Sequence, residues 1–129
     1  MRPRILVVDD EGILLNMFRL ALRALGCDMV GASSLAEGLE LGVSDRYDLV
    51  LLDNHFPEGH GDSIVPQLLA AQPEVPIVVI TGNDTDEHVA MAIEHGAREV
   101  LKKPFGLTGL SQVVKRYCEG VWSDATLVA

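Results

Sequence analysis

Five polar side chains that could handle a metal ion or a phosphate group stand at the ends of short apolar segments. They are Asp9, Asp10, Asp53, Thr81 and Lys103. Two carboxylates about 4 Å apart repel by about 4 kcal/mol at an effective dielectric constant of roughly 20, so grouped aspartates either take up protons or recruit a cation. A hard divalent cation such as Mg²⁺ suits an all-oxygen site that includes a phosphate oxygen. Three aspartates, one lysine and one such cation sum to zero charge, which would let the set accept a phosphoryl group.

Taken singly, each of these residues has a plainer interpretation. An aspartate at a strand end often only caps the next helix, a threonine there is usually an ordinary hydroxyl, and a lysine usually faces solvent. Chance is a poor explanation for the lysine, however, because two of the three lysines in the chain, Lys102 and Lys103, stand together at this one position. The hypothesis of a site therefore depends on four segment ends meeting in space.

Hydrophobic periodicity predicts the elements that would position these side chains. Apolar, β-rich segments predict strands at Arg4–Val8, Asp28–Ala32, 48–52, 75–81 and Glu99–Lys102. Amphipathic patterns predict helices at 13–25, 34–43, 63–71 and 85–95, and a last helix around 110–117. This alternation predicts an α/β fold, a doubly wound parallel sheet with helices on both faces, because parallel strands need right-handed crossovers. Ligands bind such sheets beyond the carboxyl ends of the strands, where the five polar residues are expected.

Local signals refine these boundaries. Ser34 and Glu37 form a capping box at the start of the second helix, and Pro66 is acceptable in the first turn of the third. Segment 54–61 holds one proline and two glycines and is expected to be a loop. Segment 121–129 has no clear period, so we expect one domain over 1–120 and a tail or the start of a linker after it.

Composition excludes several classes of protein. The chain has 129 residues, which fits one domain, and its 10 basic and 19 acidic residues give a net charge of −9. That charge argues against a direct nucleic-acid surface and against anionic membranes. No apolar run approaches the length of a membrane-spanning helix or a signal peptide. Cys27 and Cys118 are expected to be reduced thiols in a cytoplasmic protein, with a disulfide as the less favoured alternative.

Four motifs occur in an order typical of one family: ILVVDDE, LVLLDNHFPEGHG, IVVITG and VLKKPF. In this order and spacing they resemble the receiver domain of two-component response regulators, the CheY-like superfamily, over about residues 3–119. The resemblance implies a flavodoxin-like sheet of strand order 2-1-3-4-5. It implies that Asp53 accepts a phosphoryl group from a sensor histidine kinase or a phosphotransfer protein. It also implies Mg²⁺, with Mn²⁺ as an alternative, held by Asp10, Asp53, Asp9 through water, and the backbone carbonyl of His55.

The resemblance assigns the remaining site residues as well. Lys103 would pair with the phosphoryl oxygens, Thr81 would turn inward to hydrogen-bond them, and the Lys103–Pro104 peptide would be cis. An effector or a dimer mate would bind the face formed by the fourth helix, the fifth strand and the fifth helix. The family often has an aromatic switch residue where this chain has Val100. Coupling to the output is therefore expected to differ here or to be weaker.

The four histidines, His55, His60, His88 and His95, raise the question of a transition-metal site. None of them forms a helical HxxxH pair, so solvated histidines are the favoured interpretation. The side chain of His55 is a candidate for tuning the lifetime of the phosphoryl group, since the resemblance sets it beside the path of the attacking water. Asn83, two residues after the site threonine, is the second candidate.

Three functions compete at this stage. The favoured one is a phosphorylation-dependent switch, not an enzyme with turnover, that acts in transcription regulation and is most similar to receivers of NtrC-like, sigma-54-dependent regulators. A haloacid-dehalogenase-type phosphatase is an alternative, but it needs DxD at the nucleophile, whereas this chain reads Asp53-Asn54-His55. A phosphorylation-independent pseudo-receiver is the third, for which Val100 leaves room. Neither GxGxxG nor a Walker motif is present.

Overall fold

The computed structural model describes residues 2–82 and 86–128, and five parallel strands form its central sheet. The strands are β1 (Arg4–Val8), β2 (Asp28–Ala32), β3 (Leu49–Asp53), β6 (Ile77–Thr81) and β7 (Glu99–Lys102). Their order across the sheet is β2-β1-β3-β6-β7, with every neighbouring pair parallel. This is the predicted 2-1-3-4-5 order, and the topological switch point, where the strand order reverses, lies between β1 and β3.

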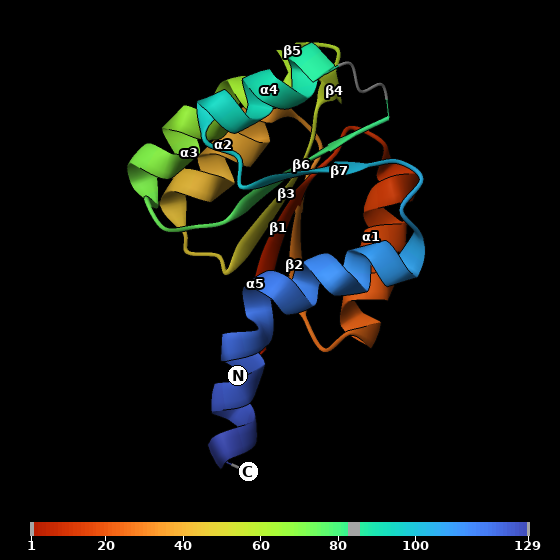
Figure 1. The fold of residues 1–129 in the computed structure, drawn as a ribbon, viewed down its shortest axis with the longest axis vertical. Helices are drawn as coiled ribbons and strands as arrows, with labels where there is room; N and C mark the ends of the chain where they lie inside the picture. Colours follow the sequence, from red (N-terminus) through yellow and green to blue (C-terminus); the bar gives the residue numbers. More distant parts are fainter. Residues whose placement is uncertain (1, 83–85, 129) are drawn as a thin grey trace.

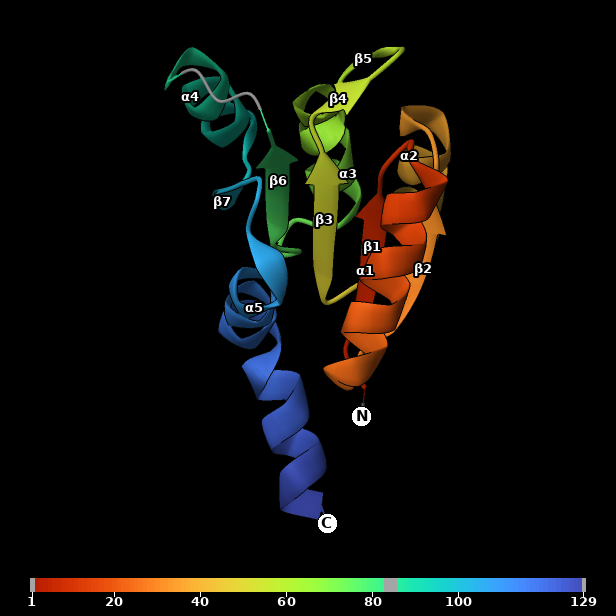
Figure 2. The ribbon, with the colours of Figure 1, turned by 90° about the vertical axis from the view of Figure 1, so that its right-hand side faces the viewer.

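Helices cover both faces of this sheet (Figures 1 and 2). They are α1 (Gly12–Ala24), α2 (Leu35–Ser44), α3 (Val65–Ala71), α4 (Asp86–His95) and α5 (Gly106–Val128), with a 3₁₀ turn, η1 (Gly61–Ile64), before α3. Helices α1 and α5 pack on one face, and α2, α3 and α4 pack on the other. The predicted doubly wound α/β architecture is therefore confirmed.

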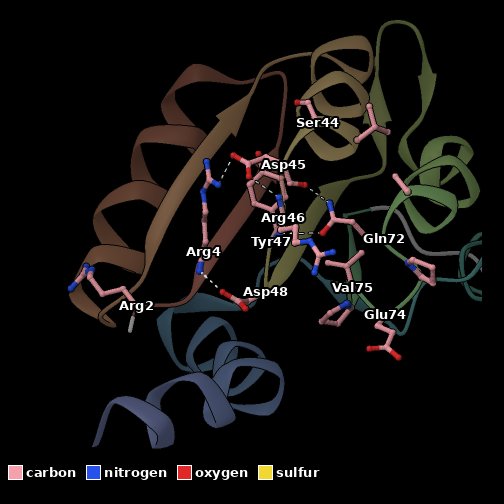
Figure 3. Close-up of a pocket in the computed structure, with 14 residues that line it drawn as sticks. Arg2, Arg4, Ser44, Asp45, Arg46, Tyr47, Asp48, Gln72, Glu74 and Val75 are labelled. Atoms are coloured by element: carbon pink, nitrogen blue, oxygen red, sulfur yellow. Dashed lines mark hydrogen bonds and ion pairs between the residues drawn. The ribbon is translucent and has the colours of Figure 1, made fainter. Parts of the chain in front are cut away.

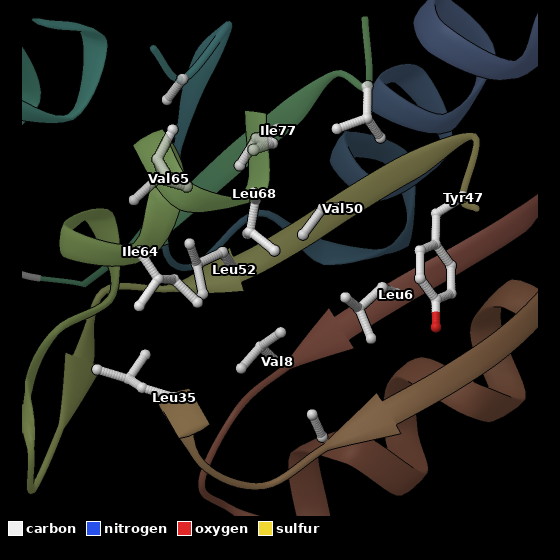
Figure 4. Packing of buried hydrophobic residues seen from close by; sticks show 14 of the residues in the cluster. Leu6, Val8, Leu35, Tyr47, Val50, Leu52, Ile64, Val65, Leu68 and Ile77 are labelled. Carbon is white, nitrogen blue, oxygen red and sulfur yellow. The ribbon is translucent and has the colours of Figure 1, made fainter. Parts of the chain in front are cut away.

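The strands are apolar throughout because alternate side chains enter two separate cores. Leu6 and Val8 of β1 contact the cluster under α2 and α3, which Figure 4 shows from close by. Ile5 and Val7 point the other way, into the cluster under α1 and α5. Burial on both faces fixes the strand register, since a slip by one residue would exchange the two cores. The register in turn fixes which residues reach the carboxyl edge of the sheet.

The predicted start of α2 is confirmed with one change of detail. The Ser34 side chain accepts the backbone N–H of Glu37 at 3.1 Å, as in a capping box. The Glu37 carboxylate, however, accepts the N–H of Ser33 at 2.7 Å, one residue before the cap. A third acceptor comes from a distant loop, because the Glu58 carboxylate takes the N–H of Leu35 at 3.0 Å. The start of α2 thus anchors the loop that follows β3.

The structure differs from the predicted elements most clearly in two segments. Segment 54–61 contains a small antiparallel hairpin, β4 (His55–Phe56) and β5 (Gly59–His60), where only a loop was expected. Two-residue strands are too short to leave a periodic signal. The last helix was predicted around 110–117, yet α5 spans Gly106–Val128 and extends beyond the sheet (Figure 2). No proline follows Gly120, so a helix nucleated by packing nearer the sheet can propagate.

The helices of the described residues include none that is both long enough and apolar enough to cross a membrane. Cys27 and Cys118 are buried free thiols, in agreement with the prediction of reduced cysteines. Burial raises the pKa of Cys27 to about 11 and that of Cys118 to about 12, so neither is a thiolate at neutral pH.

A pocket lies at the amino edge of the sheet, opposite the predicted site (Figure 3). Gln72, at the end of α3, connects the segments that line this pocket through hydrogen bonds. The Gln72 amide nitrogen donates to the carbonyls of Gly42 at 2.5 Å and Asp45 at 2.6 Å, and its oxygen accepts the N–H of Tyr47 at 3.1 Å. This side chain thus gives hydrogen-bond partners to three backbone groups of α2 and the α2–β3 connection.

Replacing Gln72 with alanine is expected to lower the free energy of unfolding by about 2 kcal/mol, because three backbone groups lose their partner. Urea denaturation measures the change. Gln67→Ala is the matched control, since Gln67 is exposed on the same helix and its loss should change stability by no more than about 0.5 kcal/mol. Equal effects of the two substitutions would contradict a structural role for Gln72.

Candidate functional site

Three carboxylates meet at the carboxyl edge of the sheet. Asp9 and Asp10 follow β1, and Asp53 is the last residue of β3, the neighbouring strand. One carboxylate oxygen from each lies within 4.8 Å of the other two. Asp9 and Asp53 are 2% and 4% exposed, whereas Asp10 faces solvent. The structure therefore brings together the aspartates that the sequence analysis grouped.

Lys103 and Thr81 complete this group. Lys103 Nζ lies 3.6 Å from Asp53 Oδ1, and the backbone N–H of Lys103 donates to the carbonyl of Thr81 at 2.9 Å. Thr81 ends β6 and is 1% exposed. The Lys103–Pro104 peptide is cis, as the resemblance implied. A pocket of about 410 Å³ opens above the cluster, and its lining includes Asp10, Asp53 and Lys103.

Burial dominates the electrostatics of the cluster. Desolvation raises the pKa of Asp9 from 3.8 to about 6, against the N–H of Glu11, which donates to its Oδ1 at 2.9 Å. Desolvation also raises the pKa of Asp53, although Lys103 and the backbone N–H groups of Asn54 and His55 oppose the shift. Burial of these two carboxylates thus destabilises the fold, and a positive charge bound in the site would stabilise them.

The donor set fits a hard divalent cation. Its atoms are all oxygens, they carry negative charge, and they converge on one point. Asp53 Oδ1 accepts no hydrogen bond from the described residues, so beyond the 3.6 Å contact with Lys103 its lone pairs remain available to a ligand. Gly82, beside the pocket, leaves the approach open, because a Cβ there would meet nothing closer than Lys103 at 3.7 Å.

The segment that follows β3 depends on a residue that sequence analysis missed. Asn54 is 2% exposed; its side-chain oxygen accepts the N–H of Asp62 at 2.9 Å, and its carbonyl accepts the N–H of Gly61 at 3.1 Å. Its own N–H donates to the carbonyl of Ile80 in β6. An asparagine after a strand carries no periodic signal, and only its buried position reveals this role.

Two other expectations concern His55 and Asn83. The His55 ring lies at the rim of the pocket, and its Nε2 is 3.3 Å from Thr81 Oγ1, a contact that the sequence did not suggest. The assignment of its backbone carbonyl to a metal stays a prediction. Asn83 lies outside the described residues. Val100 is half-buried and packs against the core under α2 and α3.

Comparison with known proteins decides the family. The model of the response regulator receiver domain matches residues 5–115. The chain belongs to this family.

Two relatives illustrate the receiver's sequence and fold. The transcriptional regulatory protein PrrA of Mycobacterium tuberculosis is 34% identical over 124 residues, which is 96% of this receiver and 53% of PrrA. The receiver therefore spans about half the length of that relative. A CheY-like receiver from Methanospirillum hungatei has the same fold, with a TM-score of 0.88 at 22% identity, covering 96% of this chain and 99% of that one.

A third likeness is to the receiver domain of the sensor histidine kinase PA1611 from Pseudomonas aeruginosa. Its TM-score is 0.82 at 24% identity, over 91% of this chain and 98% of that one. In that structure a magnesium ion is coordinated in the active-site cleft.

Without divalent cations, ionisation of Asp9 is expected to lower the free energy of unfolding of the receiver as the pH rises from 4 to 7. Its folded pKa of about 6 exceeds the unfolded value of 3.8, so its stabilising contribution is complete below pH 3.8 and disappears as the pH passes 6. At pH 7, Asp9→Asn should therefore be more stable than the wild type by about 2 kcal/mol, with little difference at pH 4. Denaturation in EDTA at both pH values measures this, and a pH-independent difference would contradict it.

Proposed function

We propose that this receiver accepts a phosphoryl group on Asp53 from the phosphohistidine of a sensor kinase or a phosphotransfer protein. The observation that carries the proposal is the meeting of Asp9, Asp10 and Asp53 beside Lys103 in one pocket, within a chain of this family. A carboxylate oxygen of Asp53 attacks phosphorus and the bond from phosphorus to the histidine nitrogen breaks. The imidazole leaves as a neutral ring, because its other nitrogen already carries a proton.

The surrounding side chains stabilise the charge that develops on the phosphoryl oxygens. Lys103 acts as a point charge from its present place beside Asp53 Oδ1. The Thr81 hydroxyl turns toward the phosphoryl group and leaves the His55 ring.

Asp10 and Asp53 are the proposed direct ligands of Mg²⁺, or of Mn²⁺. Asp9 acts through water, and the backbone carbonyl of His55 completes the protein ligands. When bound, the cation offsets the negative charge of the carboxylates and of the incoming group.

The proposed role is that of a cytoplasmic signalling switch. Phosphorylation would favour one of two conformations, read by an effector or a second copy at the face of α4, β7 and α5. Two large apolar side chains, Met91 and Ile93, are exposed on α4 and suit such a contact. The relationship to PrrA supports transcription regulation as the output. The family match over residues 5–115 supports residues 1–120 as the receiver domain.

Acetyl phosphate provides the direct test. Incubation with acetyl phosphate and Mg²⁺ is expected to raise the intact mass by one phosphoryl group, and the adduct should hydrolyse in alkali as an acyl phosphate does. EDTA should suppress its formation. A chain that takes up no phosphoryl group, or that turns over a phosphate ester through many cycles without retaining one, would refute the proposal.

A further inference from the structure

Two histidines on one face of helix α4 contact the segment that follows Asp53 along the chain. His88 and His95 are seven residues apart, or two helical turns, and so lie on the same side of α4. His95 Nδ1 is 2.8 Å from Asp62 Oδ2, and the rings of His88 and His60 have centroids 5.4 Å apart. Both partners belong to one short segment, residues 60–62, which leads from β5 into η1. Figure 1 shows α4 beside the β4–β5 hairpin at this end of the molecule.

This segment is fixed to the phospho-acceptor. The N–H groups of Gly61 and Asp62 both donate to Asn54, the residue next to Asp53. Gly61 also packs so closely on the acceptor that a Cβ at this position would lie 2.0 Å from the carbonyl oxygen of Asp53. A displacement of the acceptor backbone must therefore move residues 60–62 with it.

The Asp62–His95 contact has the properties of a coupling element. Asp62 is 4% exposed, so its carboxylate needs a partner, and a movement that separated it from His95 would leave a buried polar group without this contact. Hence α4 must follow residues 60–62 or exchange this contact for another. Either response changes the position or the mobility of α4.

A second series of contacts begins at the site threonine. His55 Nε2 is 3.3 Å from Thr81 Oγ1, and His55 is paired directly across the hairpin with His60. The two rings have centroids 6.2 Å apart, and His60 then contacts His88. A rotation of the Thr81 hydroxyl toward a phosphoryl group would remove the first contact of this series.

We infer that α4 responds to phosphorylation through two contacts, that of His95 with Asp62 and that of His88 with His60. These contacts take the role of the aromatic switch residue, whose place in β7 is occupied by Val100. The inference rests on the proposed function, since it presupposes phosphorylation of Asp53. In it, His88 and His95 are positioning residues that act through the loop and touch no reacting atom.

Hydrogen exchange of the α4 backbone amides, followed before and after treatment with acetyl phosphate and Mg²⁺, tests this coupling. The intact mass of each sample reports the extent of phosphorylation. In the wild type, phosphorylation should change the exchange rates of α4 by on the order of fivefold or more. In His95→Ala, and further in His88→Ala/His95→Ala, the change should fall below about twofold while the adduct forms as in the wild type.

Two further variants separate coupling from simple loosening of α4. Glu94→Ala removes an exposed neighbour on the same helix and should keep the wild-type response. His95→Gln keeps a donor for Asp62 and should restore part of the response, and it also serves if His95→Ala does not fold. The readout is the ratio between phosphorylated and unphosphorylated protein, which a uniform loosening would not alter.

The outcomes are distinct. Phosphorylated histidine variants with a wild-type α4 response would overturn the inference and leave the proposed function intact. A phosphorylated wild type whose α4 exchange rates are unchanged would also overturn the inference and leave the proposed function intact. No adduct on the wild type would refute the proposed function, and the inference with it.

Discussion

Asp53→Asn is expected to abolish the phosphoryl adduct completely. The amide has the size of the carboxylate but is no nucleophile for phosphorus, and no other carboxylate of the cluster combines burial with the contact to Lys103 that Asp53 has. Intact mass after treatment with acetyl phosphate and Mg²⁺ measures the result. Because desolvation raises the pKa of Asp53, removal of its charge should leave the metal-free fold at least as stable as that of the wild type.

The matched control is Asp28→Asn. Asp28 begins β2 at the opposite edge of the sheet, is exposed, and pairs with Arg2, so its loss should leave adduct formation unchanged. An adduct that persists in Asp53→Asn and is lost on alkaline hydrolysis would move the acceptor to another carboxylate. Loss of the adduct in both variants would instead indicate a general effect of charge.

The sheet and the main site were predictable because their signals are local. Segments such as Arg4–Val8 are apolar on both faces, and parallel pairing then puts their carboxyl ends, with Asp9 and Asp53, at one edge. The identity of the polar residue at each end indicated the chemistry. The family resemblance added the cis Lys103–Pro104 peptide, which no periodicity could reveal.

The connections that hold the site were not predictable, because they join residues that are distant in sequence. Glu58 caps α2 from a loop 23 residues away, and Asp62 meets His95 across 33 residues. The polar types involved are common on any surface, so nothing in the sequence distinguishes Asp62 from an exposed aspartate. Only the fold shows that its carboxylate is buried and paired. The continuation of α5 was missed for another reason, since the period of packing side chains was taken as the limit of the helix.

Gly61→Ala is expected to be the most damaging single-methyl change near the site. The added Cβ would lie 2.0 Å from the carbonyl oxygen of Asp53 and 3.2 Å from Cα of Asn54, and both are backbone atoms that no rotamer change can move. Asp53 and the segment after it must therefore separate. We expect a loss of about 3 kcal/mol in the free energy of unfolding. We also expect roughly 100-fold slower phosphorylation, the effect typical of a reacting group displaced by about 1 Å.

Gly120→Ala controls for the exchange of glycine for alanine itself. Nothing lies within 4 Å of a Cβ at Gly120, and the position is helical, so this variant should gain about 0.5–1 kcal/mol and be phosphorylated at the wild-type rate. Urea denaturation and the rate of adduct formation compare the two variants. If Gly61→Ala were as stable and as reactive as the wild type, residues 60–62 would be free to move away from Asp53. The loop could then not transmit a change at the acceptor to α4, and the proposed coupling through His95 would lose its mechanical basis.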